Sequence, residues 1–270
     1  RMVVQEYNQS FSPKPGIRVV FNDAGHILGS AFIELWVKEG DKETKLVFSG
    51  DLGRPDQLLV RDAQTVETAD FLFLESTYGA RNHKNEAESR DELASAIKYS
   101  YERGEKVIIP AFAVERTQEI IYILSEFSRA GRLPDIPIYL DSPLGIKATE
   151  IVRSHRDLFD EEALALLASG DKPTEFKGLQ YSDTVNDSKA INFDSGPCIV
   201  IAGSGMCTAG RVRHHLYNHL ADPNATVLIV GFQAMGTLGR LLVEKAKDSF
   251  RKGDLFEVVP QLIAALKGQR

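Results

Sequence analysis

The 270-residue chain has little cysteine, no excess of basic charge and no long hydrophobic run. Cys198 and Cys207 do not form a C-x-x-C pair, which excludes a thiolate zinc cage and is typical of a reducing cytoplasm. The formal net charge of −6 argues against a generally basic nucleic-acid binder, although a local basic patch stays open. Without an apolar run of about 18 residues, no membrane role is indicated.

The spacing of hydrophobic residues along the chain changes near residue 70. Between residues 17 and 50, alternation on both sides of the polar turn "KEGDKE" predicts an antiparallel β hairpin. Beyond residue 70, short apolar runs alternate with helical patterns, which is typical of parallel strands covered on both faces. We therefore predict an α/β fold in which a β-rich segment precedes a doubly wound parallel sheet.

The expected elements of that second part are short strands separated by helices. The polar segment 170–196 shows no clear period and is assigned to neither class. The strands are expected at "DFLFLES", "KVIIPAF", "IPIYLDS", "CIVIAGS" and "TVLIVGF", and the helices over 88–104, 114–129, 145–155, 160–169, 209–221 and 237–247.

Polar or small residues follow each of these strands. In open parallel sheets, ligands bind off the carboxyl ends of the strands. We therefore expect a binding cleft along one sheet edge, lined by Glu75, Glu115-Arg116, Asp141-Ser142, Ser204-Gly205 and Gln233.

His26 and Asp51 are candidate metal ligands, because each follows a predicted strand and they lie 25 residues apart. Imidazole and carboxylate together suit zinc if the two turns converge. The competing interpretation is that each residue only serves its own turn. Glu75 is placed to orient a metal-bound histidine or accept a proton, or else to satisfy the turn that follows it.

Seven segments, in order, resemble the β-CASP branch of the metallo-β-lactamase superfamily, which consists of RNA-processing nucleases. The resemblance covers residue 17 to about residue 243. It implies part of a metallo-β-lactamase αββα sandwich over 1–75, a β-CASP domain over 76–235, and a return helix with a C-terminal tail over 236–270. The segments are "DAGHILGSA", "LVFSGDLGR", "ADFLFLESTYG", "IIPAFAVERTQEII", "YLDSPLG", "IAGSGMCTAGRVRHHL" and "VLIVGFQAMGTLGRLL".

The resemblance implies a role for each residue that matches a family motif. His26 matches a zinc ligand, and Asp51 matches the catalytic aspartate that bridges two zinc ions. Glu75 matches the catalytic-site acidic residue that opens the β-CASP insertion and orients a histidine of that site. The implied reaction is hydrolysis of an RNA phosphodiester by a metal-activated hydroxide. RNA is therefore the expected partner, and the cytoplasm the expected location.

The segment "GSGMCTAGR" is a glycine-rich turn before a helix, which offers backbone N–H groups to a phosphate. Its spacing is not that of a dinucleotide fingerprint. The alternative is a purely structural turn with a basic helix face, to which Arg213 and His215 contribute. Within the resemblance, the expected RNA contacts are Arg116, Ser204, Gly205, Arg211 and His214, although Arg116 can instead pair with Glu115 or Glu119.

Two family features are absent from this sequence. No H-x-H-x-D-H string occurs, and no histidine follows His219. Because a catalytic zinc needs about three protein ligands, we expect this chain to be a fragment that is inactive alone. We also expect exposed apolar surface near residues 17–50, which would favour a homodimer or association with the missing part of the lactamase domain.

Two other functions stay open. A catalytically dead RNA-binding or scaffolding subunit would explain the missing histidines. A hydrolase of small thioesters or phosphoesters is a third possibility, since fold does not fix function. The long insertion argues against the third possibility, because a small substrate needs no such cover.

Overall fold

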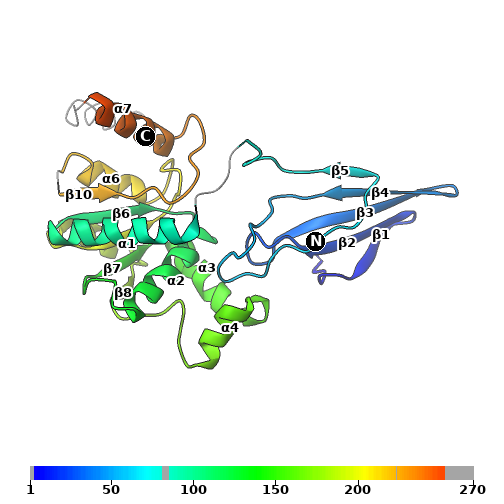
Figure 1. Cartoon of the computed structure of the whole chain (residues 1–270), viewed down its shortest axis with the longest axis horizontal. Helices are drawn as coiled ribbons and strands as arrows, with labels where there is room; N and C mark the ends of the chain where they lie inside the picture. The colour runs from blue at the N-terminus through cyan, green and yellow to red at the C-terminus, as the bar shows by residue number, and fades with distance from the viewer. Residues whose placement is uncertain (1–2, 81–84, 223, 253–270) are drawn as a thin grey trace. The chain divides into compact units, whose positions relative to one another are not determined.

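The computed structural model describes residues 3–80, 85–222 and 224–252, which form two compact units (Figure 1). The first unit contains the described residues up to position 80 together with segment 155–171. The second unit contains residues 85–154 and the described residues from 172 onward. The end of the predicted C-terminal tail, residues 253–270, lies outside the described residues.

The first unit is built on a five-stranded sheet in which the strands lie in chain order. The first four strands are antiparallel, and the tight turn at Gly40 (φ +61°) joins the predicted hairpin, which is confirmed. Ala24, Phe32 and Val47 form its small core. The strands are β1 (Ser10–Lys14), β2 (Ile17–Asp23), β3 (Ala31–Glu39), β4 (Lys42–Phe48) and β5 (Phe71–Phe73).

Strand β5 corrects one prediction, because it belongs to this first sheet and not to the later parallel sheet. It pairs in parallel with β4, and Ser49 N donates to Phe73 O at 2.9 Å. Its three apolar side chains, and Leu74 directly after it, are more than half exposed, with exposed fractions from 55% for Phe73 to 62% for Leu74. The exposed apolar surface that was expected near residues 17–50 therefore lies on β5 instead.

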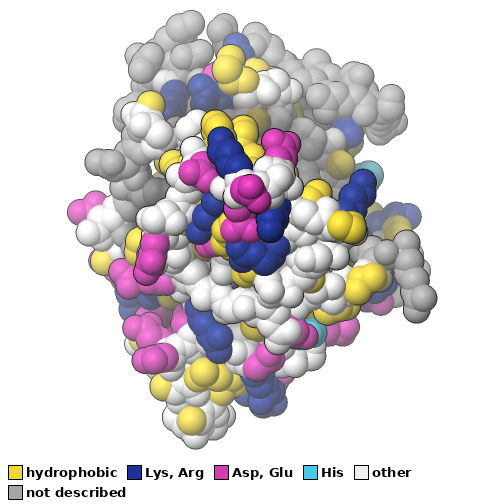
Figure 2. All heavy atoms as spheres, turned by 90° about the vertical axis from the view of Figure 1, so that its right-hand side faces the viewer, with side chains coloured by type: hydrophobic (Ala, Val, Ile, Leu, Met, Phe, Trp, Pro, Cys, Tyr) yellow, Lys and Arg dark blue, Asp and Glu magenta, His cyan; other side chains and the backbone are white. Residues whose placement is uncertain are grey.

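Charged side chains on the first sheet are paired by opposite sign. Lys45 Nζ lies 2.9 Å from Glu34, and Arg18 lies 3.3 Å from Glu43 while its guanidinium stacks over Trp36. On the face drawn in Figure 2, basic and acidic side chains are likewise intermingled. The charge on that face is therefore mixed rather than uniformly basic.

In the sequence, segment 155–171 lies between two parts of the second unit, but it packs within the first unit. It contains the 3₁₀ turn η1 (Arg156–Leu158) and helix α4 (Glu161–Ala168), which begins where Asp160 Oδ1 accepts from Ala163 N at 2.6 Å. Phe159 and Ala163 are buried, and Asp160 N donates to Leu59 O at 3.4 Å. Loop 52–63 of the first unit is thus held by a distant part of the sequence.

The second unit is a doubly wound parallel sheet, as predicted. Its strand order is β10-β6-β9-β7-β8, and all neighbours are parallel. Helices cover both faces (Figure 1). The strands are β6 (Lys106–Pro110), β7 (Ile138–Asp141), β8 (Leu179–Tyr181), β9 (Ile199–Ala202) and β10 (Ala225–Val227); the helices are α1 (Glu86–Glu102), α2 (Arg116–Arg129), α3 (Pro143–Ser154), α5 (Val185–Phe193), α6 (Val212–His219) and α7 (Leu238–Lys252).

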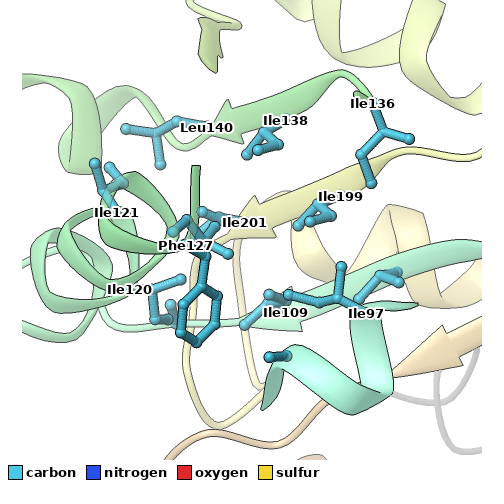
Figure 3. Close-up of a cluster of buried hydrophobic side chains, with 14 of the residues drawn as sticks. Ile97, Ile109, Ile120, Ile121, Phe127, Ile136, Ile138, Leu140, Ile199 and Ile201 are labelled. Carbon is cyan, nitrogen blue, oxygen red and sulfur yellow. The ribbon is translucent and has the colours of Figure 1, made fainter. Parts of the chain in front are cut away.

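Two hydrophobic clusters, one on each face, hold this sheet. The cluster beneath α1 and α2 is drawn in Figure 3, where branched side chains from β6, β7 and β9 surround Phe127 of α2. On the other face, Val200 and Ala202 of β9, and Cys198 just before it, pack with residues of α5, α6 and α7. Within the described ranges, no helix combines the length and apolarity needed to cross a membrane.

Segment 170–196, which shows no period in the sequence, nevertheless contains β8 and α5. A capping box starts α5: Thr184 Oγ1 accepts from Asp187 N at 3.1 Å, and Asp187 Oδ2 accepts from Thr184 N at 3.0 Å. At the other end of α5, the buried ammonium of Lys106 donates to Ile191 O at 2.7 Å and Asp194 O at 2.8 Å. This last support comes from β6, so local periodicity could not reveal it.

Substituting Lys106→Met tests that support. We expect the free energy of unfolding to fall by roughly 1–3 kcal/mol, because two carbonyl groups at the end of α5 lose a charged donor. Urea unfolding measures the change. Lys98→Met on α1, where the side chain is 72% exposed, is the control and should stay within about 0.5 kcal/mol of the original. Equal stability of both variants would show that Lys106 does not support α5.

Candidate functional site

His26 lies half-buried in the turn that follows β2, and this turn is closed by its own side chains. Ser30 Oγ accepts from His26 N at 3.1 Å and from Ile27 N at 3.2 Å. Gly25 N donates to Asp23 Oδ1 at 2.9 Å. The serine and aspartate thus fix the backbone on both sides of the imidazole.

Two glycines let the next loop pack directly on this turn. Gly25 has a φ of +60°, and a Cβ added to it would lie 2.4 Å from Ala63 N. A Cβ on Gly53 would lie 1.7 Å from Gly25 O. Gly53 N donates to Ala24 O at 2.9 Å, and Gln57 Nε2 donates to His26 O at 2.7 Å. The loop that carries Asp51 therefore lies against the turn that carries His26.

Glu75 joins a third segment to the corner formed by the turn of His26 and the loop of Asp51. Its Oε1 accepts from Leu52 N at 2.9 Å and its Oε2 from Thr77 N at 3.3 Å, while Glu75 N donates to Ser49 Oγ at 2.9 Å. The backbone hydrogen bond from Leu52 is the largest cause that lowers the pKa of Glu75, and the nearby charge of His26 lowers it further. Glu75 thus serves its own turn and also joins the loop of Asp51.

The residues of this corner do not by themselves complete a metal site. Among residues 3–80, 85–222 and 224–252, no group of three or more His, Cys, Asp and Glu residues could hold a metal ion. Both cysteines lie buried in the second unit, where burial raises the pKa of Cys198 to about 11 and that of Cys207 to about 12. The zinc roles of His26 and Asp51 stay predictions.

The second candidate region is the turn from Gly203 to Arg211, which links β9 to α6. Gly210 has a φ of +76°, and a Cβ on it would lie 2.3 Å from Gly203 O. Ser204 N donates to Ala209 O at 3.0 Å, and Val212 N donates to Gly203 O at 3.0 Å. Gly210 is required because the two ends of the turn approach each other directly at this position.

Arg211 holds this turn to the neighbouring strand β7. Its Nη1 donates to Asp141 Oδ1 at 2.8 Å and to Ser182 O at 2.7 Å, and its Nη2 donates to Asp183 O at 2.8 Å. The side chain is only 17% exposed. The guanidinium is therefore committed to the protein in this conformation, and its contact with RNA stays a prediction.

His215 corrects another expectation, because it does not add to an exposed basic helix face. It is fully buried, with Nε2 at 2.6 Å from Asp141 Oδ2 and Nδ1 at 3.0 Å from Asn192 Oδ1. Ser188 Oγ donates to the same carboxylate oxygen at 2.6 Å. Burial raises the pKa of Asp141, but the hydrogen bonds from His215, Ser188 and Arg211 outweigh it and leave that pKa below its ordinary value.

Arg116 follows β6, and Ser204 and Gly205 follow β9, on the carboxyl side of these strands. Their contacts with RNA stay predictions. His214 is exposed on α6. Arg116 pairs with Glu119 and lies 3.6 Å from Glu115, which is the structural alternative left open for it. Gln233 also lies at this edge of the sheet. The sequence did not predict its contact, in which Nε2 donates to Gly205 O at 2.9 Å.

Comparisons with known proteins identify a domain that lies largely in the second unit. A family model described as the Beta-Casp domain matches residues 117–242, a range that includes Asp141 and the whole turn from Gly203 to Arg211. The chain contains a β-CASP domain. This confirms the β-CASP resemblance that the motifs predict, and it fits the parallel sheet covered by helices.

Among curated relatives of this β-CASP chain, Ribonuclease TTHA0252 of Thermus thermophilus is 38% identical over 229 residues, which are 85% of this chain and 52% of that protein. An RNase J-like protein of Methanocaldococcus jannaschii is 36% identical over 86% of this chain and 53% of its own length. The transcription termination factor FttA of Methanosarcina mazei is 32% identical over 90% of this chain and 38% of its own. The chain thus spans about half the length of the first two relatives.

Proposed function

We propose that this chain belongs to a metal-dependent ribonuclease that processes RNA. It would supply the RNA-binding part of that enzyme and some of the residues of its catalytic site. One observation carries the proposal: the loops of His26, Asp51 and Glu75 are joined by hydrogen bonds in a chain that contains a β-CASP domain. The name of the relative from Thermus thermophilus, a ribonuclease, supports RNA as the substrate.

The roles within this proposal follow the sequence predictions. His26 and Asp51 would be zinc ligands in the full-length protein, and Asp51 and Glu75 the catalytic carboxylates. Ser204, Gly205, Arg211 and the exposed His214 would bind RNA at the turn before α6, where backbone N–H groups and the helix dipole favour a phosphate. Arg116 would add a further contact with RNA. Because the sequence has no H-x-H-x-D-H string and no histidine after His219, the 270-residue chain is expected to be inactive by itself.

A second candidate function is a catalytically dead RNA-binding or scaffolding subunit. The lack of a group of three metal-binding side chains among the described residues favours it. Both functions predict RNA binding, but only the first predicts cleavage. Association with a second copy or with a further lactamase segment is part of either proposal, and the exposed apolar residues of β5 support it. The cytoplasmic location stays a prediction.

Cleavage of an end-labelled single-stranded RNA by the full-length protein separates the two functions. The ribonuclease proposal predicts cleavage that a chelator abolishes and added zinc restores. RNA that is bound but left intact, with or without zinc, would establish the scaffolding alternative. Cleavage that is insensitive to the chelator would contradict the proposed dependence on metal.

A further inference from the structure

The buried side chain of Gln57 reaches the turn that carries His26, 31 residues earlier in the sequence. Its Nε2 donates to His26 O at 2.7 Å, while Ser30 Oγ accepts from His26 N at 3.1 Å. Both backbone polar groups of His26 are therefore held, one by its own turn and one by loop 52–63. Gln57 belongs to none of the seven segments that resemble the β-CASP branch.

The backbone of loop 52–63 is strained on both sides of Gln57. Asp56 has a φ of +57° and Leu59 a φ of +73°, which is the left-handed region. Few residues with a side chain adopt this region, and a bulky residue such as leucine is an outlier there. Strained backbone persists only where the surrounding structure holds it, and it clusters at active sites. The conformation that brings Gln57 to His26 is therefore imposed by contacts of the loop.

Two of these contacts come from segment 155–171, which belongs to the same unit. Leu59 is buried, and its O accepts from Asp160 N at 3.4 Å. Arg61 Nη2 donates to Asp157 O, 96 residues further on, at 2.5 Å. The loop is therefore held by residues outside it, and its glutamine extends from a fixed backbone.

The chemistry of an amide suits the support of an imidazole. A neutral donor fixes the His26 carbonyl without bringing another charge to the corner of His26, Asp51 and Glu75. Because this backbone carries the imidazole, a displaced carbonyl displaces the ring, and a misplacement of about 1 Å can lower a catalysed rate about 100-fold. The alternative is that Gln57 only gives the carbonyl a hydrogen-bond partner. That role affects stability but not the orientation of the ring.

We infer that Gln57 is a positioning residue for His26: its side chain, extended from the strained loop 52–63, sets the orientation of the imidazole. The inference rests on the proposed function, since it takes His26 to belong to a catalytic site. It adds a residue that lies outside the recognised motifs. It also makes segment 155–171, which holds the loop, an indirect support of the same imidazole.

Gln57→Met in the full-length protein tests this role. Methionine is unbranched and of similar length, but its side chain cannot donate to His26 O. The kcat for RNA cleavage should fall about 10- to 100-fold, because a catalytic group loses its orientation. The KM should stay unchanged, because no contact with RNA is removed.

The orientation of His26 can also be followed without any cleavage. In NMR spectra of the metal-free full-length protein, labelled at the histidine rings, the His26 signal is the one that disappears in His26→Gln. Gln57→Met should shift or broaden this signal. Gln57→Asn, whose amide is one carbon shorter, should give the same changes in signal and kcat and replaces Gln57→Met if that variant does not fold.

Gln64→Met is the matched control. Gln64 is a second glutamine that holds this turn, since its Oε1 accepts from Asp23 N at 2.9 Å. Its substitution removes a hydrogen bond of the same kind, but at Asp23 instead of His26. The kcat and the His26 signal should therefore stay as in the original protein, while urea unfolding compares the stability of the two variants.

Other results overturn the inference. An unchanged kcat and an unchanged His26 signal in Gln57→Met would show that Gln57 only satisfies the carbonyl. Equal changes in Gln57→Met and Gln64→Met would show a general loosening of the turn. If the intact full-length protein does not cleave RNA, the proposed function fails, and the NMR comparison still decides whether Gln57 orients His26.

Discussion

The Asp141→Ala variant is expected to lose about 3–5 kcal/mol of its free energy of unfolding, the range measured when one partner of a buried ion pair is removed. The carboxylate is fully buried and accepts from Arg211, Ser188 and His215. Removal leaves the buried Ser188 and His215 without this acceptor and takes one of three acceptors from Arg211. Urea unfolding measures the loss, and Asp135→Ala is the control.

The control is an exposed aspartate with a single charged partner. Asp135 lies 3.4 Å from Lys177, and both side chains are 85% exposed. An exposed pair of this kind contributes little, so Asp135→Ala should change stability by less than about 1 kcal/mol. If Asp141→Ala were equally mild, the network between β7 and α6 would not hold the glycine-rich turn.

The same variant should reveal a pH dependence. Hydrogen bonds lower the pKa of folded Asp141 below its ordinary 3.8, so the stability that this carboxylate supplies is present above pH 3.8. It is lost as the pH falls through the lowered pKa of the folded state. The difference in stability between the original protein and Asp141→Ala should therefore be constant from pH 7 to about pH 5 and shrink at lower pH. A difference that grows with acid would contradict the assigned direction.

The Gly53→Ala variant should have the second large effect, on the corner around His26. The new Cβ would lie 1.7 Å from Gly25 O and 2.3 Å from Gly25 C, and these are backbone atoms that cannot rotate away. Overpacking of this kind typically costs 1–3 kcal/mol, so we expect about 3 kcal/mol together with displacement of the His26 turn. Thermal unfolding and RNA cleavage by the full-length protein measure the two effects.

Gly40→Ala is the matched control for that variant. Gly40 has a φ of +61°, so alanine there carries backbone strain, but its Cβ would meet no atom within 4 Å. Cleavage should persist in Gly40→Ala and be lost in Gly53→Ala. Normal cleavage by Gly53→Ala would show that the close approach of the two loops does not position His26.

Periodicity predicted most of the fold, but not the partners that join distant segments. The hairpin around Gly40 and the apolar strands of the second unit follow from local pattern. The sheet to which Phe71–Phe73 belongs does not, because an apolar run fits either sheet and only pairing with β4 decides between them. Helix α5 escaped prediction since its capping box is short and its other end is held by Lys106 from β6.

The candidate site divides in the same way. The loops of His26, Asp51 and Glu75 do lie together, as the motif order suggests. The surroundings of Arg211 and His215 could not be predicted, because their shared acceptor Asp141 lies 70 and 74 residues away. A basic residue after a glycine-rich turn looks the same in sequence whether it faces solvent or a buried carboxylate.

The most direct test of the central claim is the rate of RNA cleavage by the full-length protein carrying Asp51→Ala, beside Asp41→Ala in the exposed turn between β3 and β4 as control. The account predicts that Asp51→Ala lowers bound zinc and abolishes cleavage while the second unit stays folded and still binds RNA, and that Asp41→Ala changes none of these. Cleavage by Asp51→Ala at the original rate would contradict the account.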